Sequence, residues 1–403
     1  MYADDLVILA KNENDLQNSL NNLSKYCNQW KLSINTKKTK CVVFNRGNRM
    51  CKTSIYVDDG LIENVKSIKY LGFTINAKNG SLVNTPIDLR IKAKRAIFAL
   101  NNKIKLSMLP TRLALNFFDT QIIPIILYGA EVWAPYYYYT FSNWDKCETE
   151  KTHTQFLKRI LGCDIHTPNL MIRGELGRRP LLCDVIRRSV MYIKHVDLHN
   201  GTLANQALDF EISNDDEFNI LSLVRKFTDY FSEVSNYLIP TNKTDVKKHV
   251  NDKYNNIWKT GIHQLSKSDT FNSFKTEICL EKYTWQVKNV KHKIALSRLR
   301  LSCHQLMIEK GRHHRPSLDR SERKCPHCKN LVEDECHFIT SCPLYLTERK
   351  ELYAEVRKNS LLFDEIPTHN QKFIFIISNE NVNVLNKVAA YVYKSFAIRA
   401  SLN

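Results

Sequence analysis

Apolar side chains recur at helical spacing over most of this chain. After Asn12, which can cap a helix with Asp15 at its third position, apolar residues follow at steps of three or four: Leu16, Leu20, Leu23, Cys27 and Trp30. Thr85-Pro86 has the form of a helix start, and Pro110 opens an apolar stretch that runs to Trp133. The same spacing predicts helices at 142–162, 181–198, 344–358, 369–378 and 381–400. The last of these carries a stripe that we expect to dock on the cysteine- and histidine-containing segment 325–342: Val384, Val388, Tyr391, Val392 and Phe396.

Strand patterns are short and lie near the N-terminus. Leu6–Ala10 is an unbroken apolar run that indicates a buried strand, with Asp4 and Asp5 in a turn before it. Further strands are expected at 41–45, 53–58 and 68–75, with turns at Asp59-Gly60 and Asn79-Gly80. Short strands followed by a long helical remainder predict an α+β fold.

Two longer stretches need separate treatment. Residues 201–280 are polar, with an acidic patch at 209–217, and we interpret them as a connector with some helices. Ile122–Tyr139 is apolar enough to resemble a membrane span, but Pro124, Glu131 and Pro135 interrupt it. We therefore expect a core helix and its exit there, and no membrane partner.

The net charge of the chain indicates what kind of partner it binds. The charge is +18, and such an excess of basic over acidic residues favours a polyanionic partner such as nucleic acid. Residues 31–52 include several basic side chains and no acidic one. A second basic segment, 288–324, follows Tyr283 and Trp285. Basic side chains with nearby aromatic rings suit an RNA or DNA strand, and from this segment we select Arg298, Arg300, Arg312 and Arg315. A merely basic soluble protein is the alternative.

The twelve cysteines predict a metal site. Met1 is not followed by a basic and apolar leader, so we expect an intracellular chain, nuclear or cytoplasmic and not secreted, with reduced thiols. Cys325, Cys328, His337 and Cys342 have the spacing C-x2-C-x8-H-x4-C, which suits a closed structural Zn²⁺ site. Cys336 in place of His337 stays open as an alternative ligand, and unlinked reduced cysteines are the alternative to any site.

Several segments together carry a family resemblance. Tyr2-Ala3-Asp4-Asp5 is followed by Tyr26-Cys27-Asn28-Gln29-Trp30, then by residues 32–44, and then by Ile68-Lys69-Tyr70-Leu71-Gly72-Phe73. In this order and spacing the chain resembles the reverse transcriptases of non-LTR retrotransposons, the jockey-like group in particular. Gly174–Pro180 and the cysteine–histidine motif also have counterparts in that family.

The resemblance implies a domain order. It predicts the rear part of a polymerase palm sheet at 1–80, a helical thumb-like domain at 81–200 and a helical connector at 201–285. A basic segment with the Cys-Cys-His-Cys zinc knuckle follows at 286–345, and a helical tail at 346–403. In the thumb, Lys92, Lys94 and Arg95 are expected to contact the nucleic-acid backbone.

The resemblance also implies a chemistry. Asp4 and Asp5 would bind catalytic Mg²⁺ for nucleotidyl transfer, and Lys38 would lie near the leaving pyrophosphate. The partners would be an RNA template, a DNA primer or target, and deoxynucleotides. The family also has fingers and a third catalytic Asp before this signature, and only three residues precede Asp4, so we expect no polymerase activity from the chain alone. The alternatives are a non-catalytic RNA- or DNA-binding remnant of a retroelement and a degenerate copy that does not fold.

Overall fold

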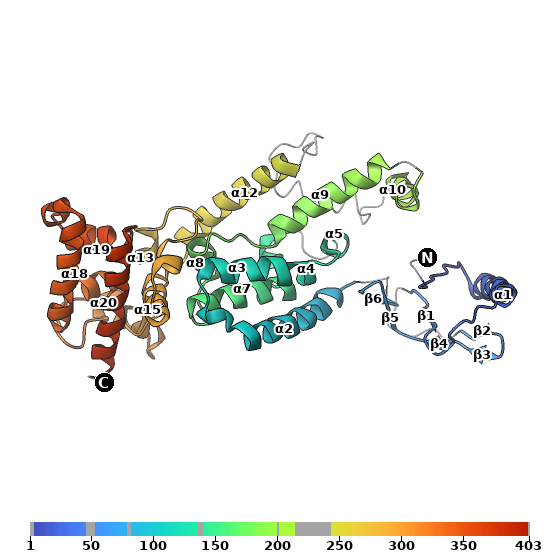
Figure 1. Cartoon of the computed structure of the whole chain (residues 1–403), viewed down its shortest axis with the longest axis horizontal. Coiled ribbons are helices and arrows are strands. Elements are labelled where there is room, and N and C mark those ends of the chain that lie inside the picture. Colours follow the sequence, from blue (N-terminus) through green and yellow to red (C-terminus); the bar gives the residue numbers. More distant parts are fainter. Residues whose placement is uncertain are drawn as a thin grey trace. The chain divides into compact units, whose positions relative to one another are not determined.

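The computed structural model describes residues 4–45, 53–78, 82–135, 140–199, 201–213 and 243–401. They form two compact units, 1–89 and 90–403, whose boundary lies within helix α2 (Thr85–Ile104) (Figure 1). The strands β1–β6 all lie in the first unit, and the second unit is built from helices. The fold is thus broadly α+β, with short strands near the N-terminus. Among the described residues, no helix combines the length and the apolar character that crossing a lipid bilayer requires.

The first unit is organised around helix α1 (Glu13–Gln29). Its start is as predicted: the Asp15 N–H donates to the Asn12 side chain at 2.9 Å. Beside the helix, strand β1 (Lys40–Cys41) pairs in parallel with β4 (Glu63–Asn64). Leu20 of the helix shares a small core with four residues from the strand region: Cys41, Ile55, Val57 and Ile62.

Two antiparallel hairpins complete the first unit. Strand β2 (Tyr56–Val57) pairs with β3 (Gly60–Leu61), and β5 (Ser67–Tyr70) pairs with β6 (Phe73–Asn76). The single strand predicted at 68–75 is therefore wrong. Leu71 and Gly72 both have positive φ, at 45° and 87°, which is the geometry of a tight hairpin turn. Leucine is not typical of turns, so the sequence pattern did not predict a turn at this position. The turn predicted at Asn79-Gly80 lies outside the described residues.

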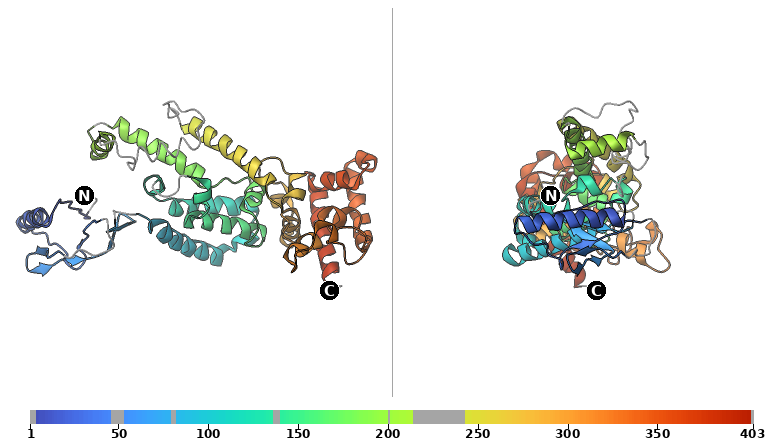
Figure 2. Two further views of the ribbon diagram at one scale, coloured as in Figure 1. Left: turned by 180° about the vertical axis from the view of Figure 1, so that it is seen from behind. Right: turned by 90° about the vertical axis from the view of Figure 1, so that its right-hand side faces the viewer.

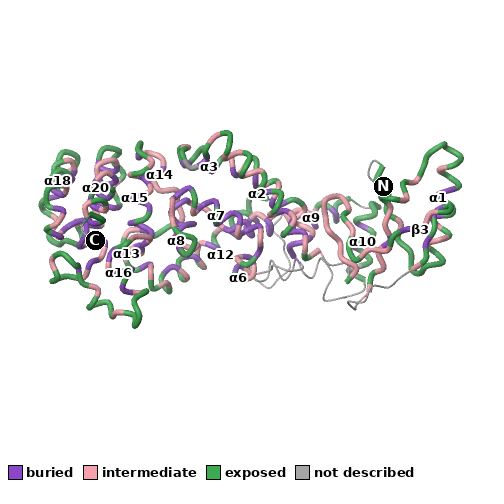
Figure 3. Tube along the Cα trace, turned by 90° about the horizontal axis from the view of Figure 1, so that it is seen from below, coloured by how far each residue is buried: buried purple, intermediate pink, exposed green. Residues whose placement is uncertain are grey.

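The apolar run Leu6–Ala10 differs from its prediction. It forms no strand in the part of the chain that the structure describes, and Leu9 is 83% exposed. The tube between the N-terminus and α1 is mostly in the colour of exposed residues (Figure 3). Asp4 does lie in a turn. A strand needs a partner for its backbone N–H and C=O groups, and no described segment pairs with this one.

The second unit opens with α2 and a broken helical stretch. The continuous helix predicted from Pro110 to Trp133 is instead α3 (Thr111–Phe117), a π-helical turn η2 (Phe118–Ile122), α4 (Ile123–Ile126) and α5 (Ala130–Trp133). Pro124 lacks the N–H that an α-helix needs, so the hydrogen-bond pattern widens just before it. Gly129, with φ 58°, lies directly before α5 and separates it from α4.

The middle of the second unit contains the longest described helix. After α6 (Phe141–Trp144), α7 (Glu148–Leu161) and α8 (Asn169–Glu175), helix α9 (Leu182–Leu198) packs along α12 (Lys243–His263) (Figures 1 and 2). In the sequence, α10 (Leu203–Ser213) follows α9, and α13 (Asp269–Asn272) follows α12. The segment interpreted as a connector thus supplies a core helix, whose buried stripe is Val246, Val250, Tyr254, Trp258 and Ile262.

A buried carboxylate joins α6, α7, α8 and the start of α9. Glu150 is fully buried and accepts hydrogen bonds from Trp144 Nε1 at 2.6 Å, Arg173 Nη2 at 2.8 Å and the Leu181 N–H at 2.8 Å. His153 Nδ1 lies 3.1 Å from the same carboxylate. Burial alone would raise the pKa of Glu150, but the charges of His153 and Arg173 lower it to about 2.

This carboxylate should make the second unit sensitive to acid. Because its folded pKa of about 2 lies below the ordinary value of 4.5, its contribution to stability is complete above pH 4.5 and is lost as the pH falls toward 2. The contribution is at most about 3 kcal/mol. The free energy of unfolding is measured with urea at pH 7, 4.5 and 3 for the native chain and for Glu150→Gln. We expect it to fall more steeply with decreasing pH in the native chain. If the free energy of unfolding depends on pH in the same way in both proteins, the predicted role of Glu150 is contradicted.

The C-terminal part packs around one core. It contains α14 (Tyr283–Gln286), α15 (Val290–Arg300), α16 (Met307–Lys310), α17 (Glu335–Thr340), α18 (Leu346–Asn359), α19 (His369–Ile377) and α20 (Val382–Ala400). The predicted docking of the tail is present. Tyr391 of α20 donates its hydroxyl to the Phe338 carbonyl at 2.6 Å, and the ring of Phe396 stacks on that of Phe338. Arg399 also forms two 2.8 Å hydrogen bonds with the buried carboxylate of Glu333.

Candidate functional site

The predicted zinc ligands come together in the structure. Ligand atoms of Cys325, Cys328 and His337 lie within 4.8 Å of one another. Cys328 Sγ is 3.5 Å from His337 Nε2, and Cys342 Sγ is 3.9 Å from Cys325 Sγ. Two thiols and an imidazole thus converge from two short segments, and the Cys342 thiol lies beside one of them, that of Cys325.

Local backbone geometry positions each of these donors. The Cys325 N–H donates to the Leu331 carbonyl at 2.8 Å, and the Lys329 N–H donates to the Cys325 carbonyl at 2.9 Å. Lys329 has φ 59°, and this tight turn directs Cys325 and Cys328 to one side. On the other side, His337 lies in the first turn of α17, and the Cys342 N–H donates to the His337 carbonyl at 2.9 Å just after the helix ends.

The electrostatics of the group fit a zinc ion. Burial lowers the pKa of His337, which keeps the imidazole neutral as a metal ligand must be. Its Nδ1 lies 3.1 Å from Ser341 Oγ, the kind of outer contact that orients a ligating histidine. Burial raises the pKa of the Cys342 thiol to about 12, so a cation is needed to hold a thiolate there. This donor set could hold Zn²⁺ in a closed site.

The two neighbouring residues with donor atoms are directed elsewhere. Cys336 Sγ lies 3.7 Å from Thr340 Oγ1, one turn along α17, and Cys336 is not in the converging group. His327 is exposed beside Cys328 and is also outside the group. The geometry favours His337 over Cys336 as the ligand. Ser341 had not been singled out, although its position four residues after His337 would place it beside that ring on a helix.

Within the described ranges, the predicted magnesium ligands Asp4 and Asp5 do not belong to a carboxylate cluster. Asp4 and Asp5 are both exposed in the first unit, as is Lys38. Among the described residues, the metal-ligating side chains that converge are those of the cysteine–histidine group, and no carboxylates form such a cluster. Two adjacent exposed carboxylates do not by themselves fit a two-metal centre, which needs ligands on both sides of each ion.

The selected basic residues have different environments. Lys92, Lys94 and Arg95 are exposed on α2, and Arg315 is exposed after the η3 turn (Gly311–His313). Arg312 is half-buried, and its guanidinium bonds Glu309 and the Ser266 carbonyl. The exposed Arg298 donates from Nε to the Gly162 carbonyl at 2.7 Å.

Arg300 does not fit the nucleic-acid contact that the sequence predicted for it. Its side chain is buried and hydrogen-bonded to Glu175, so no part of the guanidinium can meet a phosphate. Arg298 and Arg300 are two residues apart on α15, and positions two apart on a helix point in different directions.

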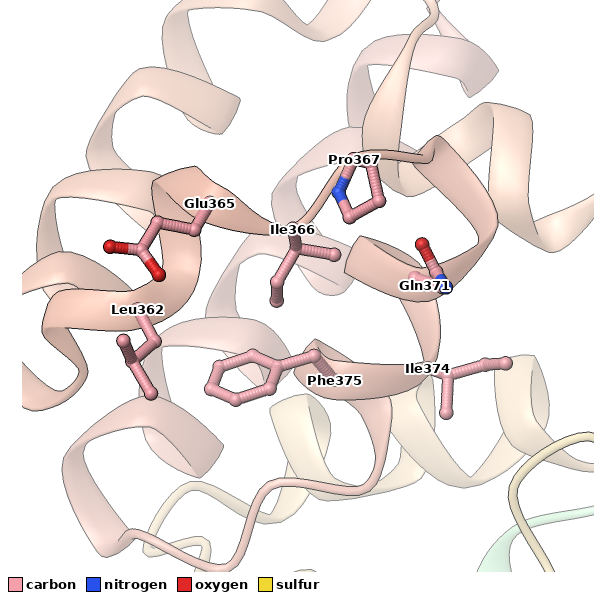
Figure 4. Close-up of a pocket in the computed structure, with 7 residues that line it drawn as sticks. All are labelled: Leu362, Glu365, Ile366, Pro367, Gln371, Ile374 and Phe375. Carbon is pink, nitrogen blue, oxygen red and sulfur yellow. The ribbon is translucent and has the colours of Figure 1, made fainter.

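A shallow apolar groove lies apart from all of these residues. Leu362, Ile366 and Phe375 face one another across it, and Glu365 lies at one side (Figure 4). Pro367, Gln371 and Ile374 complete the lining. None of the sequence-predicted site residues lines this groove.

Comparison with known proteins identifies the N-terminal part. Residues 1–75 match the family described as reverse transcriptase (RNA-dependent DNA polymerase). A transposon-derived protein of Caenorhabditis elegans is 27% identical over 208 residues, which are 48% of this chain and 70% of that protein. The first 75 residues are therefore part of a reverse transcriptase domain, in a chain that is a distant homologue of a transposon-derived protein.

Proposed function

We propose that this chain is the C-terminal part of a retrotransposon RNA-directed DNA polymerase, acting on RNA and DNA in the nucleus or cytoplasm. The observation that most strongly supports this function is the reverse transcriptase match over 1–75, which includes Asp4, Asp5 and Lys38. In a complete palm the two carboxylates would hold Mg²⁺, and Lys38 would lie near the phosphates of the incoming deoxynucleotide. The helical second unit would hold the RNA template and the DNA primer.

The zinc centre would serve this function by shaping a binding surface. Zn²⁺ held by Cys325, Cys328, His337 and Cys342 would fix the basic loop before it, which includes the exposed Arg315. Four protein ligands leave a zinc ion no open position for a substrate, so its role is structural. Exposed cations near a rigid knuckle suit the phosphates of a single strand.

A second function has its own supporting observation. Because Asp4 and Asp5 are exposed and no carboxylate cluster occurs among the described residues, the chain could bind RNA or DNA without chemistry. Because we expect no polymerase activity from the chain alone, the two are distinguished by primer extension with Mg²⁺ on an RNA template after the chain is joined to the fingers and first catalytic Asp of a reverse transcriptase. Incorporation that is lost in Asp4→Asn/Asp5→Asn supports the polymerase, whereas binding without incorporation supports the non-catalytic remnant.

Nucleic-acid binding should depend on the exposed cations of α2. Each phosphate contact contributes about 0.7–0.9 to the slope of log affinity against log salt. Removing three contacts with Lys92→Ala/Lys94→Ala/Arg95→Ala should lower the slope by about 2 to 3, measured by fluorescence anisotropy with an RNA–DNA template–primer.

A matched variant controls for net charge. Lys247, Lys248 and Lys259 are exposed on α12, and Lys247→Ala/Lys248→Ala/Lys259→Ala removes the same three charges. We expect this variant to keep the native slope within about half a unit. Equal losses in the two triple variants would show that only the total charge matters and would contradict a binding surface on α2.

A further inference from the structure

Two helix ends in the second unit meet through a pair of cysteines. Cys163 follows the end of α7, where Gly162 has φ 65°, and the Cys163 N–H donates to the Lys158 carbonyl at 3.0 Å. Cys303 follows the end of α15 in the same way, after Ser302 with φ 48°. Its N–H donates to the Arg298 carbonyl at 2.8 Å. Both cysteines thus occupy the same position of a helix-ending motif, which fixes their backbones.

The two helix ends are in close contact. Arg298 Nε donates to the Gly162 carbonyl at 2.7 Å, directly before Cys163. A side chain at Gly162 would meet Ile294 of α15 at 2.7 Å, so the packing leaves no gap on that side. The Asp164 N–H donates to Cys303 Sγ at 3.1 Å, which brings the sulfur against the backbone next to Cys163. Both cysteines are free thiols in the structure.

The surroundings of Cys303 favour its thiolate. The Cys163 thiol is a hydrogen-bond partner of the Cys303 sulfur, and together with the Asp164 N–H, the Thr167 hydroxyl and the charge of Arg298 it lowers the pKa of Cys303 to about 5 against the effect of burial. The carbonyl ends of helices oppose a negative charge, so these donors and not the helix dipoles account for the lowering. The same hydrogen bond and burial raise the pKa of Cys163. The pair therefore combines a nucleophile with a protonated partner.

We propose that Cys163 and Cys303 form a reversible disulfide that joins the end of α7 to the end of α15. With hydrogen peroxide as the oxidant, the Cys303 thiolate attacks one peroxide oxygen, the O–O bond breaks, and hydroxide leaves with a proton from solvent as water. The resulting sulfenic acid is attacked by Cys163, whose thiol proton leaves with the hydroxyl as a second water. Two thiols are oxidised and one peroxide is reduced. A small dithiol reverses the bond by thiol–disulfide exchange.

The disulfide would covalently connect two parts of the second unit. Helix α15 leads into the segment that contains Cys325 and Cys328, and α7 contains the buried Glu150. Bridging them closes a loop of well over a hundred residues, and loops of that length gain the most from a cross-link in the chain-entropy view. The oxidised protein should therefore unfold at a higher temperature than the reduced protein.

The test is peptide mapping of the full chain after peroxide treatment. The protein is treated with hydrogen peroxide, blocked with iodoacetamide, digested without reductant and analysed by mass spectrometry. We expect a cross-linked pair of peptides that contain Cys163 and Cys303. Its mass should be the sum of the two peptide masses less two hydrogens, and it should disappear after treatment with dithiothreitol. Its absence, at peroxide doses that oxidise the half-buried Cys27 of α1, would overturn the assignment.

Single variants separate the two roles. In Cys163→Ser the sulfenic acid at Cys303 has no partner, so dimedone should label Cys303 and no cross-link should form. In Cys303→Ser neither the cross-link nor dimedone labelling of Cys163 is expected. In the native chain, iodoacetamide at pH 6 should modify Cys303 faster than Cys27, because the donors around Cys303 stabilise its thiolate. Equal rates at the two cysteines, or dimedone labelling of Cys163 in Cys303→Ser, would contradict the proposed chemistry.

Discussion

Replacing Cys328 with serine should remove zinc from the chain and destabilise its C-terminal core. Cys325 and Cys342, which face Cys328 and His337, are themselves part of the hydrophobic cluster that includes Phe338 and Tyr391. Structural zinc sites have apparent binding free energies of about 10–16 kcal/mol, so losing one ligand should cost several kcal/mol of folding free energy. Elemental analysis should give one zinc per native chain and less than about a tenth of that for Cys328→Ser.

The matched control is the cysteine beside the ligand. Cys336→Ser makes the same chemical change one residue from His337, but its thiol contacts Thr340 and lies outside the ligand group. We expect Cys336→Ser to keep its zinc and to unfold within about 3 °C of the native chain. Zinc loss in Cys336→Ser with zinc retained in His337→Ala would show that the ligand is Cys336. A native chain purified without zinc that also binds none on addition would contradict the site itself.

The zinc group could be predicted because its geometry is local. Cys325 and Cys342 are 17 positions apart, and the short turn and short helix between them bring Cys325, Cys328 and His337 together, with Cys342 beside Cys325. The start of α1 was predictable for the same reason, because Asn12 and Asp15 interact across three residues. In both cases the partners are near in sequence, so composition and spacing contain the needed information.

Other elements depended on information that spacing does not contain. The Leu71-Gly72 turn was missed because leucine at positive φ gives no turn signal. Helix α12 could have been found from its stripe at four-residue steps, since Val246, Val250 and Tyr254 are all buried. The burial of Leu6–Ala10 could not be decided from its own residues, because a strand is stable only with a partner.

Arg300 shows most clearly what sequence spacing cannot predict. Its helix is rich in basic residues, and by residue type alone Arg298 and Arg300 look equivalent there. The partner that separates them, Glu175, is 125 residues away. Only the packing of α15 against α8 shows that one guanidinium is exposed and the other is buried. The same contact gives Glu175, within the Gly174–Pro180 segment, a structural role.

Replacing Arg300 with alanine should destabilise the second unit by about 3–5 kcal/mol. Arg300 Nε donates to the fully buried Glu175 at 2.5 Å, Nη2 lies 2.9 Å from Glu281, and Nη1 donates to the Ile377 carbonyl at 2.7 Å. One side chain thus connects α8, the segment before α14 and the end of α19. Truncation would leave the Glu175 carboxylate buried without its main counter-charge, which is far costlier than losing an exposed ion pair.

The control is an arginine with a similar partner in solvent. Arg357 bonds both oxygens of Asp364, but the two side chains are 51% and 59% exposed, so Arg357→Ala should cost at most about 1 kcal/mol. Urea unfolding at pH 7 compares the two variants. Adding Glu175→Gln to Arg300→Ala should recover part of the loss, because the orphaned charge is then removed. If Arg300→Ala costs no more than Arg357→Ala, the buried network does not hold α8, α15 and α19 together, and the packing of apolar residues alone must do so.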